Sequence, residues 1–215
     1  MASLFHRLKR KFLPPSAKLE GYENEELVDV VFRKTLAYRP NKEDWPDVIG
    51  ATTVLDFGGA CGAHYKEAIL HTPGVRWAVV ETPAMVRKAS QLSSDRLNFF
   101  SSIAAAFAWL GSIDLMHSSG ALQFAPDPER AVAELCGLGA KRLHWRRLVL
   151  SHSETIRDMQ PSFLTDNGPG KLDSVQEKCV EYGRTKIPER TFLAAHSARY
   201  RLVERGVDWF RFELL

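Results

Sequence analysis

The sequence predicts an α/β fold with three layers, in which a mostly parallel β-sheet carries helices on both faces. Two apolar runs lead to this prediction: one ends at Asp56 before a glycine-rich loop, Gly58 to Gly62, and the next spans Val75 to Glu81. Further strand-like runs alternate with helical segments along the rest of the chain. Strands that alternate with helices in this way pair in parallel through right-handed crossovers, and the ligand of such a sheet binds at the carboxyl ends of its strands.

The length and composition indicate a single soluble domain. A chain of 215 residues with 45% hydrophobic and 26% charged residues can bury one sizeable core, and no apolar run approaches the length that spans a bilayer. The formal net charge of +3 is too small to indicate a nucleic-acid partner. The cysteines, Cys61, Cys136 and Cys179, are odd in number and far apart, so we expect no disulfide framework, no metal site and a cytoplasmic location.

Residues 1–20 are expected to form a basic amphipathic arm ahead of the domain, which we place at 21–215. Apolar and basic side chains are mixed from Met1 to the Pro14-Pro15 pair. Such a segment can make weak peripheral contact with an anionic inner membrane surface, or it can stay solvated. The second alternative is favoured because short basic termini are commonly disordered.

A leading helix is predicted over residues 24–38, ahead of the first strand. Asn24 is a suitable N-cap, Glu25 and Glu26 favour the first helical turn, and a broad apolar stripe that includes Leu27 follows. Pro40 marks the end of this helix. The sequence favours simple packing of the helix against the sheet over a role at the ligand.

The remaining elements follow from apolar runs, turn residues and helix-start signals. Strands are predicted at 54–56, 75–81, 97–100, 113–117 and 147–152, and helices at 64–70, 83–91 and 188–195, with another helix starting at Asp127-Pro128-Glu129. Residues 200–215 are expected to form one or two terminal strands around Arg205-Gly206. The segment 160–171 is rich in turn formers and is either a mobile lid loop over the site or a structureless surface linker.

The glycine-rich loop and Glu81 together indicate a nucleotide-cofactor site. Gly58, Gly59 and Gly62 allow a tight turn that brings the backbone close to a ligand, and an acid at the end of the next strand accepts hydrogen bonds from ribose hydroxyls. A dinucleotide would place its pyrophosphate near the negative charge of Asp56, whereas S-adenosylmethionine (SAM) carries a sulfonium and an ammonium group. Asp56 therefore favours SAM.

Three segments resemble the motifs of class I SAM-dependent methyltransferases. The run VLDFGGACG resembles their D/E-x-G-x-G-x-G loop with Ala60 in place of the middle glycine, Glu81-Thr82-Pro83 resembles their acidic motif, and Ser112 to Phe124 resembles their fourth-strand motif. Over roughly residues 20 to 150 the chain is similar to bacterial methyltransferases that are often encoded beside surface-polysaccharide genes. The resemblance implies a Rossmann-like fold with an antiparallel C-terminal strand, and O-methylation of a sugar or small metabolite in surface-glycan biosynthesis. It carries neither a specific acceptor nor an oligomeric state.

The resemblance also implies which residues hold the cofactor. The residues expected to bind SAM are Asp56, Gly58, Gly59, Ala60, Gly62, Glu81, Thr82, Pro83, Ser101, Ser102 and Ser118. Among them Glu81 is expected on the ribose, with Thr82 or Pro83 near the adenine. Ser118 and Gln123 are expected to face the transferred methyl group or the acceptor.

Methyl transfer to a hydroxyl is helped by a base that removes the hydroxyl proton. His117 is the first choice because it ends the predicted fourth strand at the ligand edge, and His152 ends the predicted fifth strand in a similar place. His64, at the start of the first helix, is the third choice. Each histidine can instead bond a loop backbone, and proximity alone can support the reaction.

Two other functions remain open. A nicotinamide-dependent oxidoreductase also uses a glycine loop and an acid, although Asp56 and the missing regular G-x-G-x-x-G pattern argue against it. A non-catalytic binding protein with the methyltransferase fold is compatible with Ala60 in the loop and with the short C-terminal segment.

Overall fold

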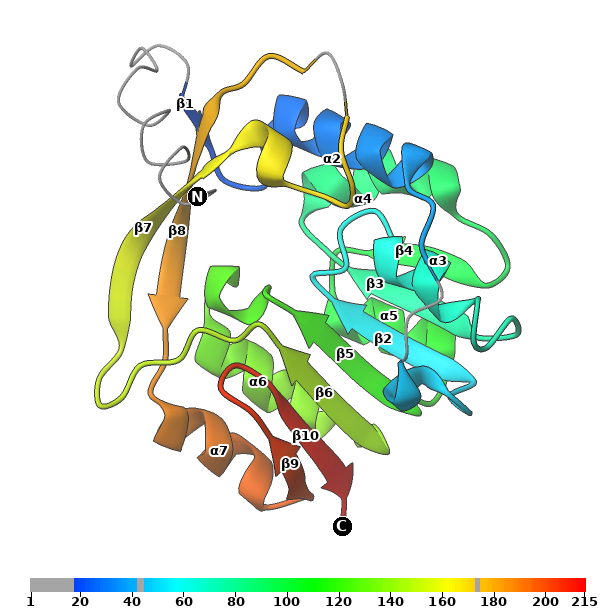
Figure 1. Ribbon diagram of the computed structural model, residues 1–215. Helices are drawn as coiled ribbons and strands as arrows, with labels where there is room; N and C mark the ends of the chain where they lie inside the picture. Colours follow the sequence, from blue (N-terminus) through cyan, green and yellow to red (C-terminus); the bar gives the residue numbers. More distant parts are fainter. Residues whose placement is uncertain (1–17, 42–44, 173–174) are drawn as a thin grey trace.

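The computed structural model describes residues 18–41, 45–172 and 175–215. Within these residues the chain forms a central seven-stranded sheet and a smaller three-stranded sheet (Figure 1). Most of the basic arm expected at 1–20 lies outside the described residues. No helix in the described part is both long enough and apolar enough to cross a membrane.

The central sheet confirms the predicted α/β fold. Its strands are β2 (Thr53–Phe57), β3 (Arg76–Val80), β4 (Leu97–Phe100), β5 (Leu115–Ser119), β6 (Arg142–Arg146), β9 (Tyr200–Arg205) and β10 (Phe210–Leu214). They lie in the order β4-β3-β2-β5-β6-β10-β9. The strands from β2 to β6 pair in parallel, and β10 runs antiparallel between β6 and β9. The C-terminal segment therefore forms two full strands, one of them the predicted antiparallel strand.

Helices cover both faces of this sheet (Figure 1). One face carries α2 (Glu25–Ala37), α3 (Ala63–Ala68) and α4 (Pro83–Ala89), and the other carries α5 (Ile103–Leu110), α6 (Pro128–Gly137) and α7 (Glu189–Ser197). Successive side chains of a strand point to opposite faces, so Val54 packs with Leu27 and Trp77 while Leu55 packs with Met116. The result is three layers with a separate apolar core on each side of the sheet.

The leading helix forms as predicted. The side-chain oxygen of Asn24 caps α2 by accepting hydrogen bonds from the backbone N–H groups of Glu26 (3.0 Å) and Leu27 (3.2 Å). At the other end, the ammonium group of Lys66 on α3 donates to the backbone carbonyls of Thr35 and Tyr38. Lys66 thereby satisfies the last carbonyls of α2 and ties this helix to α3.

The predicted fifth strand is wrong, because β6 spans Arg142–Arg146 and not 147–152. The strand ends at Arg146 because the next residue, Arg147, adopts a left-handed backbone with φ of 52°. This conformation is incompatible with an extended strand. The apolar residues that follow, Leu148 to Leu150, form an irregular connection. The fourth strand, β5, also runs two residues past its predicted end at His117.

A second sheet, which the sequence did not predict, stands beside the central one (Figure 1). Its middle strand, β8 (Cys179–Lys186), pairs in parallel with β1 (Lys18–Glu20) and antiparallel with β7 (Ile156–Phe163). Four short 3₁₀ helices complete the described part of the chain: η2 (Pro46–Val48), η3 (Ser90–Leu92), η4 (Leu122–Phe124) and η5 (Leu164–Asp166). Strand β8 packs against η4 near the carboxyl end of β5.

The lid loop predicted at 160–171 is corrected by this second sheet. Residues 160–163 belong to β7, and side-chain hydrogen bonds hold the turn that follows. Lys34 of α2 donates to the Thr165 carbonyl (2.7 Å), and the Tyr182 hydroxyl donates to the side chain of Asn167 (2.6 Å). The segment is therefore attached to α2 and β8.

Candidate functional site

Most of the residues predicted to bind the cofactor lie at the carboxyl edge of the central sheet. The loop after β2 lies between the segments that follow β3 and β5, because β2 is hydrogen-bonded to both strands. Residues 58–62, 81–83 and 118–121 therefore lie side by side. The segment after β4, with Ser101 and Ser102, adds the next position along the same edge.

The glycines of the loop after β2 make room for other parts of the protein. Gly58 and Gly62 have φ of 76° and 83°, which glycine adopts without strain, and Ala60 between them has φ of 51°. A side chain at Gly58 would overlap the methyl group of Ala121, and one at Gly59 would overlap the carboxylate of Asp56. Internal packing thus accounts for two glycines that were expected to admit a ligand.

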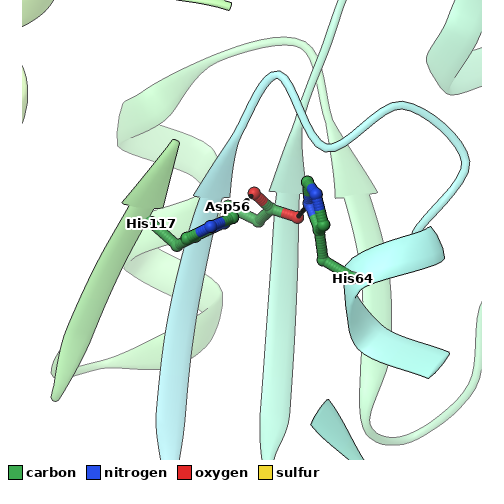
Figure 2. Close-up of side chains that lie close together, drawn as sticks. All are labelled: Asp56, His64 and His117. Carbon is green, nitrogen blue, oxygen red and sulfur yellow. Dashed lines mark hydrogen bonds and ion pairs between the residues drawn. The ribbon is translucent and has the colours of Figure 1, made fainter. Parts of the chain in front are cut away.

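Asp56 lies at the centre of a buried cluster with His64 and His117, which we call the Asp56 cluster (Figure 2). One carboxylate oxygen accepts a hydrogen bond from Nδ1 of His117 (2.9 Å), and the other contacts Nδ1 of His64 (3.0 Å) and accepts from the Trp77 indole (3.2 Å). Asp56 and His117 have no exposed surface. The Asp56 carboxylate therefore faces the protein interior, in contrast to its predicted place at the cofactor.

The pKa values of the two imidazoles in the Asp56 cluster are shifted in opposite directions. Burial lowers the pKa of His117 to about 4 despite the hydrogen bond and the charge of Asp56. Burial is also the largest single influence on His64 and acts to lower its pKa, but the charge and hydrogen bond of Asp56 and the charge of Glu67 together raise it above its usual value. Burial alone would raise the pKa of Asp56, yet the two imidazoles hold it well below its usual range. The cluster thus holds a carboxylate, one imidazole whose protonation is favoured, His64, and one neutral imidazole, His117.

The same three residues are of the types that bind metal ions, and their ligand atoms lie within 4.8 Å of one another. Both carboxylate oxygens, however, already contact an imidazole nitrogen at hydrogen-bond distance. Hydrogen bonds within the cluster satisfy the Asp56 carboxylate, whereas Nε2 of the buried His117 has no hydrogen-bond partner among the described residues.

Neither predicted catalytic base, His117 or His152, lies at the end of a strand at the carboxyl edge, where it was expected. His117 lies inside β5, and its side chain points to Asp56 on one face of the sheet, where no acceptor hydroxyl can reach it. Its lowered pKa also makes it a weak base. His152 is exposed in a bend well beyond the end of β6, since the strand that was predicted to end there does not exist.

Glu81 occupies the predicted position at the end of β3. One carboxylate oxygen accepts a hydrogen bond from the backbone N–H of Ala60 (3.0 Å), and the other accepts from that of Thr82 (2.9 Å). Burial raises the pKa of Glu81 to about 7 against these two hydrogen bonds, and the charges of Asp56 and Glu23 add to the increase. The acid is thus directly attached to the glycine loop.

The remaining predicted residues have distinct surroundings. The Thr82 hydroxyl caps α4, Pro83 is the exposed first residue of that helix, and Ser102 caps α5. Ser101 is exposed beside it. Ser118 is buried, and its hydroxyl has no hydrogen-bond partner among the described residues.

Three aromatic residues near this edge were not predicted as part of the site. Tyr22 stacks on Tyr182 with ring centroids 4.3 Å apart, and Phe124 contacts both rings edge-on. The Tyr22 carbonyl accepts a hydrogen bond from the Thr82 hydroxyl (3.4 Å), which places this group beside the segment after β3. Tyr182 gave no signal in the sequence because its strand, β8, was itself not predicted.

The comparisons with known proteins bear on the fold. No family model matches the sequence, and no curated protein matches it. Solved structures do match. The sugar N-methyltransferase KedS8 from a Streptoalloteichus species is 18% identical, with a TM-score of 0.51 over 100% of this chain and 92% of that one. CalS10, an amino pentose methyltransferase from Micromonospora echinaspora whose structure contains bound SAM, is 18% identical, with a TM-score of 0.53 over 91% of this chain and 92% of that one. The chain therefore has the α/β fold of these methyltransferases.

Proposed function

We propose that this protein is a SAM-dependent methyltransferase that methylates a hydroxyl group of a sugar or a related small metabolite. The observation that carries the proposal is the contact between Glu81 and the Ala60 amide, which joins the acid after β3 to the glycine loop after β2. In a sheet of this order, that arrangement suits a ribose held by the acid and a cofactor lying along the loop.

The same contact favours SAM over a dinucleotide. A pyrophosphate needs free backbone N–H groups at the loop. The backbone N–H of Ala60 already donates a hydrogen bond to Glu81, so it is not free for a pyrophosphate. The Glu81 carboxylate beside the loop also makes this position unfavourable for a phosphate. SAM, with its positively charged sulfonium and ammonium groups, fits the same surroundings.

The roles of individual residues follow from this proposal. Glu81 holds the ribose, Thr82 and Pro83 lie near the adenine, and Ser101 or Ser102 bonds the adenine edge. The buried Ser118 hydroxyl and the Gln123 side-chain oxygen, which lack partners among the described residues, are available to the methyl donor or the acceptor. When bound, SAM would supply the methyl group to the acceptor hydroxyl, whose proton would pass to water.

The acceptor class rests on the resemblance to glycan-associated methyltransferases and on the sugar substrates named for KedS8 and CalS10. We place the reaction in surface-glycan biosynthesis in the cytoplasm. Because His117 is buried, positioning of the acceptor and the methyl donor carries the catalysis in this proposal.

Calorimetric titration of the full-length protein with S-adenosylhomocysteine and, separately, with NAD tests the cofactor. Binding of S-adenosylhomocysteine alone is expected, and Glu81→Ala should weaken it while the protein stays folded. Binding of NAD alone would indicate an oxidoreductase. Binding of neither would indicate a non-catalytic protein with this fold.

A further inference from the structure

Arg147 adopts a strained backbone at the carboxyl edge of the sheet. Its φ of 52° lies in the left-handed region, and among the described residues the only other non-glycine residue with positive φ is Ala60 of the glycine loop. Glycine or asparagine takes this conformation more readily than arginine does. Residues held in such conformations cluster at ligand sites, where the side chain is needed in one particular place.

Neighbouring groups hold the backbone of Arg147 in this conformation. The Gly120 N–H donates to the Arg146 carbonyl (2.9 Å), which joins the turn after β5 to the end of β6. The buried side-chain amide of Gln123 then donates to the carbonyls of Gly120 (3.0 Å) and Arg147 (3.3 Å). The two turns thus form one unit that holds the backbone of Arg147 in place.

The Arg147 side chain lies beside the proposed cofactor site. A Cβ atom added to Gly120 would be 3.4 Å from its Nε and 3.5 Å from its Cζ, and the next residue, Ala121, packs against Gly58 of the glycine loop. Burial raises the pKa of Tyr22 to about 12, with the charge of Glu81 adding to this effect and that of Arg147 opposing it. Tyr22 is therefore close to both charges.

The guanidinium group of Arg147 is not neutralised by the protein. Arg184, Arg205 and Arg211 each contact a carboxylate at 3.0 Å or less. Arg147 is exposed, and its side chain has neither an ion pair nor a hydrogen bond within 18–41, 45–172 and 175–215. An unpaired guanidinium fork is suited to binding a carboxylate or a phosphate.

We propose that Arg147 forms an anion-binding subsite for the acceptor, and that the acceptor carries an acidic group, either a phosphate or a carboxylate. This inference rests on the proposed methyltransferase function and deepens it. The subsite belongs to the acceptor because Arg147 follows β6, on the far side of β5 from the loop after β2 and from Glu81.

The test is a calorimetric titration of the full-length protein with glucose 1-phosphate, glucuronate and glucose, with and without saturating S-adenosylhomocysteine. Comparison of glucose 1-phosphate with glucuronate shows whether the subsite prefers a phosphate or a carboxylate, and glucose is the neutral reference. We expect one acidic sugar to bind at least about tenfold more tightly than glucose. This preference should disappear in Arg147→Gly and Arg147→Asn, be partly retained in Arg147→Lys, and be unchanged in Arg190→Ala, which alters an exposed arginine on α7.

Two further readouts separate this role from a structural one. Arg147→Gly should melt at the same or a higher temperature than the wild type, because glycine suits the left-handed backbone. The affinity for S-adenosylhomocysteine should be unchanged in all Arg147 variants. A drop in that affinity would mean that Arg147 binds the carboxylate of the cofactor, which overturns the inference.

The inference is also overturned if the wild type does not prefer an acidic sugar, including the case in which none of the three sugars binds, or if the preference persists in Arg147→Asn. If the wild type binds an acidic sugar through Arg147 but does not bind S-adenosylhomocysteine, the anion subsite stands and the methyltransferase proposal fails.

Discussion

Two carboxylates near the glycine loop have opposite electrostatic character because their partners differ. Asp56 contacts two imidazoles, and together they hold the pKa of this fully buried carboxylate well below its usual range. Glu81 accepts hydrogen bonds only from neutral backbone amides, which compensate less for burial, and its pKa is raised to about 7. Glu81 is consequently the acid whose charge changes near neutral pH.

At the residue scale we predict that cofactor affinity depends on the ionisation of Glu81. Below a pH of about 7 the carboxyl group is protonated, so acidification removes the charge that accepts hydrogen bonds from the ribose. The affinity for S-adenosylhomocysteine should fall as the pH is lowered through this value. Glu81→Gln should bind tenfold or more weakly, since a charge-assisted bond contributes roughly 1.5 to 3 kcal/mol, and should show no such pH dependence.

Calorimetry at a series of pH values checks this prediction. Glu134→Gln, which changes an exposed acid on α6, is the matched control and should behave as the wild type. A wild-type affinity that is constant across neutral pH would remove Glu81 from the ribose.

At the element scale, the loop after β2 depends on its packing against the turn after β5. Gly58 combines a left-handed φ of 76° with direct contact to Ala121. Its backbone N–H also donates to the Val80 carbonyl of β3 (2.9 Å). This one residue therefore connects the ends of three neighbouring strands.

Gly58→Ala is predicted to destabilise the protein through two separable effects. The added methyl group overlaps Ala121, which costs roughly 1 to 3 kcal/mol, and the left-handed backbone costs about 1 to 2 kcal/mol more. The double variant Gly58→Ala/Ala121→Gly should recover the first part only. Denaturant unfolding of the four proteins measures this coupling.

Gly137→Ala is the control for the loop variants, because a Cβ atom at Gly137 meets nothing within 4 Å and the residue ends α6 with an ordinary backbone. It should be close to neutral. Strictly additive effects of Gly58→Ala and Ala121→Gly would contradict the proposed packing.

At the scale of the whole molecule, each face of the central sheet buries a neutral histidine. His117 lies on the face covered by α2 and α3. His196 lies on the other face, where its Nδ1 donates to the Phe192 carbonyl (2.7 Å) and its Nε2 accepts from the Trp145 indole (2.9 Å). Burial lowers the pKa of each to about 4. Lowering the pH should therefore destabilise the packing on both faces of the sheet, because each buried histidine resists protonation in the folded protein.

We predict that the free energy of unfolding falls as the pH is lowered from about 6.5 to about 4. In this range the unfolded chain protonates both histidines and the folded protein does not, so each costs at most about 3 kcal/mol. Glu81 acts in the opposite direction, because its raised pKa lets the folded protein hold a proton below a pH of about 7. The raised pKa of His64 adds to the free energy of unfolding at low pH, and this contribution is lost only as the pH rises.

Denaturant unfolding across this pH range measures the effect. His117→Gln and His196→Gln should each reduce the slope of stability against pH by about one proton, while His152→Gln, at an exposed position, should leave it unchanged. Equal slopes in all four proteins would contradict the assignment of neutral buried histidines.

The sequence by itself determined the elements whose signals are local. The cap and stripe of α2, the strands β2, β3 and β4, the proline start of α6 and the terminal strand pair all depend on neighbours within a few residues. The glycine loop at the end of one strand and the acid at the end of the next likewise predicted that these two segments lie at the carboxyl edge of the sheet. Helix α5 and strands β7 and β8 lacked equally clear local signals and were not predicted.

The tertiary structure alone decided what each polar side chain contacts. Parallel pairing sets Asp56 opposite His117, and His117 opposite His144, so these side chains share one face of the sheet. Because of this register, Asp56, predicted to bind the cofactor, and His117, predicted as the base, are hydrogen-bonded to each other in the interior. Gly58 is likewise needed for packing, because it contacts Ala121. Such contacts join residues far apart in the chain, and their partners depend on strand register and layer packing, which no local pattern encodes.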